Sequence, residues 1–538
     1  MRMKGLTPYW DALIVTASND VQAEAYRMLF SSRNGSGVLA PFKRWLVVAD
    51  PGGRRIGSGG STLLCLMEIV RAECQSRKIL IDSWKKLEDF LCSLRVMIVH
   101  AGGDSRRLPA YAPCGKLFVP IPEPSGTGTT TLFDRLVADL SSLPAGRTGA
   151  GQYLVVSGDA LLLYDPAEVC FDFPGMTAVC VPSSLEQCSK HGVLCAEADG
   201  SARLYLQKPS LDMMRSTGAI LEDQKGLLDA GLMSFDARFA SGMMAAVGME
   251  VTPDGRLEWP GRFHQITLEQ GLDIYREICC ALGTQSSFEH YLRSVRESGS
   301  KLDETDLKSL YAGLKDLPLY CQKVSRCEFL HFGTTRQLMT SAATLCSGSS
   351  GSRFILNTKL QSGGQVQGNA FWVEGCILNA PVKLDGENVL TGVTVETELV
   401  LPQGACLDIA QGTTSEGDCC WFIRPYGVRD SFKDSVAVGG TFCGMPLTQW
   451  LELIGIDPAW VWDQSDQPER CSLWNARLFP ACPDEMSYRE WLWYFRPEQA
   501  RLHPEYVERF RQTPRYDCAQ IAVLTHLGAF HQRRAASR

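Results

Sequence analysis

Residues 100–109, HAGGDSRRLP, place two glycines and two arginines directly after an apolar run, RVMIVH. Gly102 and Gly103 let the backbone approach a ligand closely and offer N–H groups to phosphate oxygens. Arg107 supplies positive charge for such phosphates, and Lys116, in APCGKLF, could return to the same place. A tight turn with solvated arginines accounts for the same residues. The chain contains no GxxxxGK[ST] segment, so this is not a Walker phosphate loop.

Three further side chains could take part in chemistry, and each has a structural alternative. Asp159, in VVSGDA, stands at a predicted strand end, where it either binds a metal ion or caps a helix. Lys208, in YLQKPS, precedes a proline and is either a functional cation or a surface lysine. His191, in HGVL, is either a ligand contact or a hydrogen-bonded turn residue.

Alternating strands and helices must position these residues. Such alternation predicts a parallel α/β sheet that is covered by helices on both faces. Ligands of these sheets bind beyond the carboxyl ends of the strands, which is where the glycine-rich and Asp-bearing segments fall. The strands are predicted at 11–17, 45–50, 95–103 and 152–165, with helices at 19–30 and 63–72.

The sequence pattern changes after about residue 350. Short apolar pulses separated by Asn and Gly resemble the rungs of a β-helix, although a β-sandwich remains an alternative. The last part is predicted to be helical, and its Trp residues at helical spacing indicate core positions. A chain of 538 residues exceeds one ordinary core. The predicted domains are 1–345, 346–445 (left-handed β-helix-like) and 446–538 (helical).

Composition excludes several classes of protein. The net charge of −7 and the pI of about 5.7 argue against a surface that coats nucleic acid, so no nucleic-acid partner is expected. No apolar run of about 18 residues exists, and no membrane partner is expected. The 21 cysteines include no CxxC pair, which argues against a zinc or disulfide framework. We expect reduced thiols and a cytoplasmic location.

The segment HAGGDSRRLPAYAPCGK resembles the signature GGxGTRLxP…K of sugar-nucleotide pyrophosphorylases. More specifically, it resembles the L-fucose-1-phosphate guanylyltransferase family, which includes one half of the bifunctional fucokinase/GDP-fucose pyrophosphorylases. Ser105 replaces the third glycine of the signature. Further matching segments, in chain order, are DPGGRRIGSGGST, SGDA, HGV, LQKPS, LLDAG, LDIY, FLHFGTT, RPYGVRDSFK and LWNARLFP.

The resemblance implies a fold, a reaction and a set of roles. The fold is a Rossmann-like (GT-A-like) nucleotidyltransferase domain followed by a β-helix-like domain. The reaction joins GTP and β-L-fucose 1-phosphate to give GDP-L-fucose and pyrophosphate, with Mg²⁺ as cofactor. The implied contacts are Gly102, Gly103, Ser105, Arg107 and Lys116 for the triphosphate; Gly57, Gly59, Gly60 and Thr62 for the nucleobase side; Asp159 for Mg²⁺; and Lys208, His191 and Asp229 for the sugar phosphate.

Two features depart from the pattern of the relatives. The GGxGxR-like unit comes third along the chain here, whereas in most relatives it comes first, which leaves the strand order open. His331, in FLHFGTT, falls where relatives supply a second metal-binding aspartate. Asp273, in GLDIY, is the candidate replacement; alternatively Asp159, phosphates and water hold the ion.

Rival functions remain open at this point. One rival keeps the fold but uses another nucleotide or another sugar 1-phosphate. A second is a sugar kinase, but the 538 residues contain no PxGSGLGTSSAL-like loop, so a kinase would be a separate protein or a missing part of a longer chain. A third is a non-catalytic module that binds sugar nucleotides. A homo-oligomer built through the β-helix is a further expectation.

Overall fold

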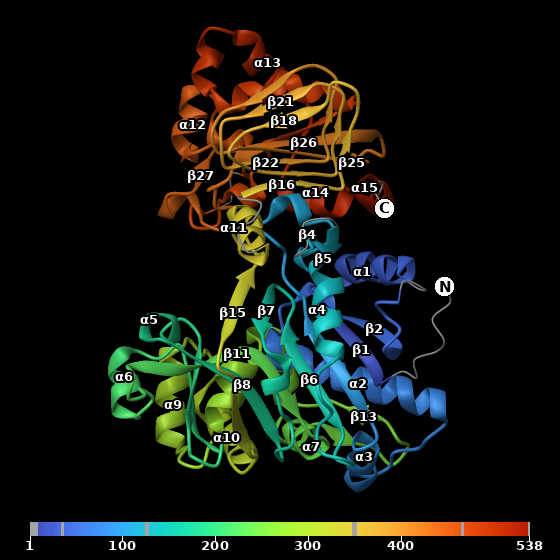
Figure 1. Ribbon diagram of the computed structural model, residues 1–538, viewed down its shortest axis with the longest axis vertical. Coiled ribbons are helices and arrows are strands. Elements are labelled where there is room, and N and C mark those ends of the chain that lie inside the picture. Colours follow the sequence, from blue (N-terminus) through green and yellow to red (C-terminus); the bar gives the residue numbers. More distant parts are fainter. Residues whose placement is uncertain (1–8, 34–36, 124–128, 347–351, 464–466, 536–538) are drawn as a thin grey trace. The chain divides into compact units, whose positions relative to one another are not determined.

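The computed structural model describes residues 9–33, 37–123, 129–346, 352–463 and 467–535 (Figure 1). The chain forms two compact units. The first unit contains residues up to 102 together with 136–329, and the second contains 103–135 together with 330–538. The segment that follows Gly102 therefore belongs to the second unit.

A mixed sheet forms the centre of the first unit, which confirms the predicted α/β class. Four neighbouring strands run parallel in the order β2-β1-β3-β6, and β11 joins β6 antiparallel. Beyond β11 the sheet continues through β9 and β10 and also through β8 and β14. The bounds are β1 Trp10–Ala17, β2 Phe42–Ala49, β3 Arg95–His100, β6 Gln152–Ser157, β8 Met176–Ser184, β9 Gly192–Ala196, β10 Ala202–Gln207, β11 Lys225–Phe235 and β14 Leu319–Lys323.

The strand order determines where a ligand crevice lies. β1 pairs with β2 on one side and with β3 on the other, so the chain changes direction across the sheet between β1 and β3. A crevice is expected outside the carboxyl ends of strands at such a switch point. The predicted strand 152–165 is interrupted, because β6 ends at Ser157 and β7 (Ala160–Tyr164) begins only after Gly158 and Asp159. Asp159 consequently lies in a turn at the carboxyl end of β6.

Helices cover the sheet of the first unit. The buried residues Ile14 and Ile98 belong to one core with Leu66 of α2 and Phe239 of α7. Tyr26 of α1 donates a hydrogen bond to the Ala101 carbonyl at 3.1 Å, next to the glycine pair. The helices that contain residues of this unit are α1 Asp20–Ser32, α2 Gly57–Arg77, α3 Trp84–Leu91, α4 Leu132–Ser141, α5 Leu185–Cys188, α6 Leu211–Ser216, α7 Ala237–Ala246, α8 Arg262–Gln270, α9 Phe288–Glu297 and α10 Glu304–Leu314.

Short parallel strands build the second unit. They form three sheets, ordered β16-β19-β22-β25, β17-β20-β23 and β18-β21-β24, and partners such as Val389 and Cys406 lie one coil apart. The strands are β16 Ser352–Leu356, β17 Lys359–Leu360, β18 Gln365–Gln367, β19 Ala370–Glu374, β20 Ile377–Leu378, β21 Pro381–Leu384, β22 Asn388–Thr391, β23 Thr394–Val395, β24 Leu399–Leu401 and β25 Ala405–Thr413.

The C-terminal part of the second unit mixes short helices with strands. β26 (Cys419–Gly427), β29 (Phe479–Cys482) and β30 (Arg515–Tyr516) extend the sheet of β25 antiparallel. Trp450 and Trp491 are fully buried, which confirms the expectation of core positions for these two residues, whereas Trp460 is 46% exposed and departs from it. The helices of this unit are α11 Thr335–Leu345, α12 Leu447–Leu453, α13 Pro504–Gln512, α14 Cys518–Leu524 and α15 Leu527–Ala535.

One pair of cysteines departs from the prediction of reduced thiols. Cys180 of β8 and Cys321 of β14 form a disulfide bond, so the prediction is wrong for this pair. The two strands run side by side in the sheet, which brings cysteines 141 residues apart in sequence into contact. The other nineteen cysteines form no disulfide bond among the described residues. Among the described residues, every helix is too short or too polar to span a lipid bilayer.

Candidate functional site

The loop that follows β3 carries the predicted phosphate-binding residues Ser105, Arg107 and Lys116, and it is anchored within the second unit. Tyr111 accepts a hydrogen bond from Trp372 Nε1 at 2.9 Å and donates to Glu374 at 3.3 Å. The carbonyl of Arg107 accepts from the backbone N–H of Thr335 at 3.1 Å. The backbone on which these side chains are mounted is thus held by buried partners.

The two neighbouring arginines of this loop differ in their contacts. Arg106 bonds to Asp104 at 2.9 Å and lies 5.9 Å from the ring of Trp474. Arg107 is exposed, and no described residue pairs with its guanidinium. Arg107 is therefore the arginine of this pair whose charge is available to an anion, and Arg106 offers a matched control.

Ser105 adopts a conformation that favours glycine. Its φ is +54°, which explains why related signatures carry glycine at this position. The side chain is 5% exposed, and its Oγ has no hydrogen-bond partner among the described residues. A strained residue with an unsatisfied hydroxyl is the kind of feature that is retained at binding sites.

Replacing Ser105 by glycine should stabilise the fold. The substitution removes left-handed strain and an unsatisfied buried hydroxyl, and we expect the free energy of unfolding to rise by about 1 kcal/mol. Denaturant unfolding of the parent and the Ser105→Gly protein measures this difference. A matched Ser→Gly change at exposed Ser216 of α6 should instead destabilise by about 0.5–1 kcal/mol. A Ser105→Gly protein less stable than the parent would contradict the strain argument.

The predicted helix 63–72 begins earlier than expected, at Gly57, so the glycine-rich residues 57–62 form the first turns of α2 rather than a loop, and the loop prediction is wrong for them. This glycine-rich start of α2, called the glycine-rich loop in the prediction, packs against the segment 271–278. The N–H groups of Gly59 and Gly60 donate to the Leu272 carbonyl at 2.8 and 3.0 Å. Gly57 begins α2 with φ +76°, and a Cβ there would lie 2.4 Å from the same carbonyl oxygen. These predicted nucleobase contacts therefore have a packing role that is visible in the structure, and their contact with a base stays a prediction.

Thr62, in the second turn of α2, is hydrogen-bonded to His100, a residue that was not among the predicted contacts. Its Oγ1 donates to the Ser58 carbonyl at 2.9 Å and lies 2.9 Å from His100 Nε2, so His100 Nε2–H is the donor of the second bond. Burial lowers the pKa of His100 to about 4, which keeps the ring neutral. The signal in the sequence was the position of His100, at the end of the apolar run and separated from the glycine pair by one residue.

The predicted sugar contacts come together at the end of the β9–β10 hairpin. The backbone N–H of Lys208 donates to the His191 carbonyl at 2.9 Å, and both residues are exposed. Lys208 has φ +48°, a second strained residue among the predicted contacts. Gly192, next to His191, allows close approach, because a Cβ there would lie 2.0 Å from Tyr205 Oη and 3.1 Å from the Asp229 Cβ. His191, Lys208 and Asp229 are thus brought to one region.

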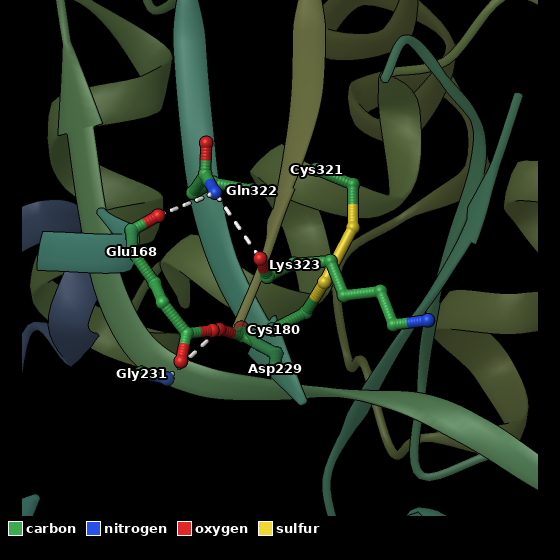
Figure 2. The surroundings of a disulfide bond; sticks show 7 residues. All are labelled: Glu168, Cys180, Asp229, Gly231, Cys321, Gln322 and Lys323. Atoms are coloured by element: carbon green, nitrogen blue, oxygen red, sulfur yellow. Dashed lines mark hydrogen bonds between the residues drawn. A yellow bond between two sulfur atoms is a disulfide. The ribbon is translucent and has the colours of Figure 1, made fainter. Parts of the chain in front are cut away.

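Asp229 is a buried carboxyl held by two donors. It accepts from Tyr205 Oη at 2.7 Å and from the Gly231 N–H at 2.8 Å. Burial raises the pKa of Asp229 to about 6, against the opposing effect of these two hydrogen bonds. Asp229 pairs in register with Cys180, so the disulfide lies beside it, as Figure 2 shows. Such a carboxyl changes its charge just below neutral pH.

The predicted metal ligands, Asp159 and Asp273, lie in the first unit. Asp159 accepts from Ser157 Oγ at 2.6 Å. Asp273 accepts from Ser58 Oγ at 3.1 Å and from the Arg276 N–H at 2.8 Å, which makes it the cap of the turn Ile274–Ile278. Burial and then the charges of Asp229, Asp273, Asp159 and Cys279 raise the pKa of Tyr275. Asp159 and Asp273 therefore both raise the pKa of the same residue, Tyr275.

The candidate ligands Asp159 and Asp273 provide only part of the oxygen ligands that a hard cation such as Mg²⁺ prefers. The part of the chain that is described contains no group of three His, Cys, Asp or Glu side chains placed to hold a metal ion. Mg²⁺ usually takes one or two carboxylates together with substrate phosphates and waters, so Asp159 with or without Asp273 fits such an ion. His331 ends β15 (Cys327–His331) within the second unit, and its carbonyl accepts from Ser341 Oγ.

The sequence predicted most of these residues as contacts, and the structure shows which of them lie together. The first unit brings together the glycine-rich loop with Asp273, His191 with Lys208, and the three carboxyls of Asp159, Asp229 and Asp273 around Tyr275. Gly102 ends the first unit's part of the loop, and Gly103, Ser105, Arg107 and Lys116 belong to the second unit.

The sequence did not indicate Asp50 as a candidate. Its carboxylate accepts a hydrogen bond from Ser61 Oγ at 2.9 Å, and burial raises the pKa of Asp50 to about 6.

Comparison with known proteins adds independent evidence. The Fucose pyrophosphorylase domain matches residues 88–484, which is most of the chain. A bifunctional fucokinase/GDP-fucose pyrophosphorylase of Arabidopsis thaliana is 27% identical over 96% of this chain, and the chain spans about half (51%) of that relative's length. Fucose-1-phosphate guanylyltransferases of Mus musculus and Homo sapiens are 25% and 24% identical; each match covers 88% of the chain, and 84% and 82% of those proteins.

Proposed function

Because the chain belongs to the fucose pyrophosphorylase family, we propose that it is a fucose-1-phosphate guanylyltransferase. The observation that carries the proposal is a family match that spans the glycine pair, Asp159, Lys208 and Asp229. The substrates are GTP and β-L-fucose 1-phosphate, and the products are GDP-L-fucose and pyrophosphate. A separate sugar kinase would supply the fucose 1-phosphate, as the bifunctional relative's name indicates for that protein.

The finer fold assignment belongs to this proposal. The parallel order β2-β1-β3-β6 with helices between the strands supports a Rossmann-like nucleotidyltransferase domain. Three parallel sheets of short strands with partners one coil apart support a β-helix for β16–β25. The handedness of this β-helix, a homo-oligomer built on it and a cytoplasmic location remain parts of the proposal.

The chemistry follows from charge. A phosphate oxygen of the sugar phosphate attacks the α-phosphorus of GTP in line, and pyrophosphate leaves from the opposite side. The nucleophile is already anionic, so no general base is required. The barrier lies in bringing two polyanions together, and the chain's contribution is positioning and neutralisation by Arg107, Lys116 and Lys208. Exposure of Arg107 and Lys208 leaves both cations accessible to such substrates.

Asp159, with Asp273 as a second candidate, would hold Mg²⁺. When bound, this ion neutralises phosphate charge and orients the phosphates. Asp159 lies at the carboxyl end of β6, in line with its place in the proposed crevice. The hydrogen bonds of Thr62 to Ser58 and His100 would hold the glycine-rich start of α2 in place for the nucleotide.

Pyrophosphate release tests the proposed reaction. The purified chain is incubated with Mg²⁺, one of GTP, UTP or ATP, and either fucose 1-phosphate or mannose 1-phosphate. We expect rapid release only with GTP and fucose 1-phosphate. Faster release with UTP, or with mannose 1-phosphate, would assign a different nucleotidyltransferase. No release in any combination, with GTP at 100 times its Kd failing to add about 2.7 kcal/mol of stability, would remove the proposal.

Replacing Lys208 by alanine should weaken the sugar phosphate specifically. Loss of one charged contact costs about 1.5–3 kcal/mol, so we expect the KM for fucose 1-phosphate to rise by about 10- to 100-fold while the KM for GTP stays within about twofold. Initial rates at varied concentrations of each substrate measure both constants. Lys225→Ala, which removes an exposed lysine paired with Asp223, is the control. An unchanged sugar KM would show that Lys208 is a surface lysine.

A further inference from the structure

The segment 271–278 joins the glycine-rich loop to the region of Asp229. Ser58 Oγ donates to Asp273 and accepts from the Ile274 N–H at 2.9 Å, while the Leu272 carbonyl accepts from Gly59 and Gly60. The following residues, Ile274–Ile278, form one π-helical turn. Such turns are rare and occur frequently at functional sites. The turn is anchored at the loop, and it carries Tyr275.

Tyr275 places its hydroxyl over the bend of β11 that holds Asp229. A Cβ on Gly231 would lie 3.7 Å from Tyr275 Oη, and the Gly231 N–H donates to Asp229. The register of β11 against β8 shifts between Asp229 and Met233, which bends the strand at this point. Figure 2 shows Asp229 and Gly231 side by side, joined by their hydrogen bond. The hydroxyl of Tyr275 and the carboxyl of Asp229 therefore adjoin the same three-residue bend.

The hydroxyl of Tyr275 differs from those of the neighbouring tyrosines. Tyr205 donates to Asp229, Tyr291 to the Glu277 carbonyl at 3.0 Å, and Tyr311 to the Ser286 carbonyl at 2.8 Å. Tyr275 Oη has no hydrogen-bond partner among the residues that the structure describes, and the residue is only half-buried. A hydroxyl that lies beside a buried carboxyl and has no partner among the described residues is available to a ligand.

The two side chains offer complementary hydrogen-bonding groups. A phenolic hydroxyl, whose ordinary pKa is about 10, is a donor near neutral pH. Asp229, when ionised, only accepts.

We propose that Tyr275 determines sugar specificity together with Asp229. Tyr275 donates a hydrogen bond to one hydroxyl group of the sugar 1-phosphate, and the same hydroxyl group donates a hydrogen bond to Asp229. The inference rests on the proposed function and gives a role to Tyr275, which ends the matching segment LDIY but was assigned no contact there. A sugar hydroxyl can donate one hydrogen bond and accept another. Because Tyr275 is a donor and Asp229 an acceptor beside the same bend, the two side chains can bind one sugar hydroxyl together. Sites that hydrogen-bond a substrate hydroxyl discriminate strongly against analogues that lack it.

The test uses Tyr275→Phe with fucose 1-phosphate and its monodeoxy analogues. Phenylalanine retains the ring and removes only the donor. We expect the KM for fucose 1-phosphate to rise about 10-fold, with the KM for GTP and the thermal midpoint unchanged. One monodeoxy analogue lacks the hydroxyl that Tyr275 contacts, so the parent protein should already have a high KM for it. For this analogue, Tyr275→Phe should not raise the KM further. This loss of sensitivity would identify the hydroxyl that Tyr275 reads.

Tyr311→Phe is the matched control. It removes a tyrosine hydroxyl with a purely internal partner, the Ser286 carbonyl, so it should lower stability without changing either KM. An unchanged sugar KM in an active Tyr275→Phe protein, or a shift of the GTP KM instead, would overturn the inference. A parent protein that releases no pyrophosphate with fucose 1-phosphate would overturn the proposed function itself, so the two failures are distinguishable.

Discussion

Replacing Arg107 by alanine is expected to lower kcat by a factor of about 10³ or more. In phosphoryl transfer a well-placed arginine contributes on the order of 10³ to 10⁵ to the rate, because it neutralises charge that develops in the transition state. The Arg107 side chain is exposed, and its guanidinium pairs with no described residue, so no carboxylate of the described residues neutralises its charge. The KM for the sugar phosphate should change far less than kcat, because the contribution is made in the transition state.

Arg106→Ala is the control for this experiment. Arg106 is the adjacent residue, carries the same charge and is paired with Asp104. Its removal changes the net charge by the same amount but should leave kcat within a few-fold. Single-turnover rates with GTP and fucose 1-phosphate compare the two variants. Near-normal turnover of the Arg107→Ala protein, or an equal loss in both variants, would remove Arg107 from the mechanism.

The second large effect is expected for Asp229→Asn, which should improve stability and impair sugar binding. The native pKa of Asp229 lies at about 6, above the ordinary value of 3.8. Between these values the native state binds more protons than the unfolded state, so stability falls as pH rises from about 4 to 6. At pH 8 the ionised carboxylate costs up to about 3 kcal/mol. Asparagine carries no charge, and after the loss of one hydrogen bond we expect a gain of about 1–2 kcal/mol at pH 8.

Unfolding by denaturant at pH 4 and pH 8 measures this prediction. The gain should be present at pH 8 and absent at pH 4, where the carboxyl of the parent is already largely protonated. The same variant should show a KM for fucose 1-phosphate raised by 10-fold or more. Asp236→Asn, which weakens a buried cap of α7, should instead destabilise at pH 8. A destabilised Asp229→Asn protein at pH 8 would contradict the proposed cost of the buried charge.

The sequence alone predicted several elements of the first unit and proposed the candidate residues. Apolar runs predicted β1, β2 and β3 to within a few residues, because alternation of buried strands and amphipathic helices is a local property. Glycines and acidic residues at strand ends indicated a ligand crevice, because parallel strands carry their carboxyl ends to one edge. The family itself followed from short motifs in chain order, and the domain match confirmed it.

Tertiary structure decided which of these residues meet. Ser58 and Asp273 are 215 residues apart, and no local pattern predicts their hydrogen bond. The same holds for the Cys180–Cys321 disulfide and for the loop after Gly102, which is held by Tyr111, Trp372 and Glu374 within the second unit. Local periodicity reports which face of an element is buried, whereas its neighbours depend on strand order and on close approach at residues such as Gly57 and Gly192. The position of Tyr275 beside Gly231 of β11 depends on the same long-range packing.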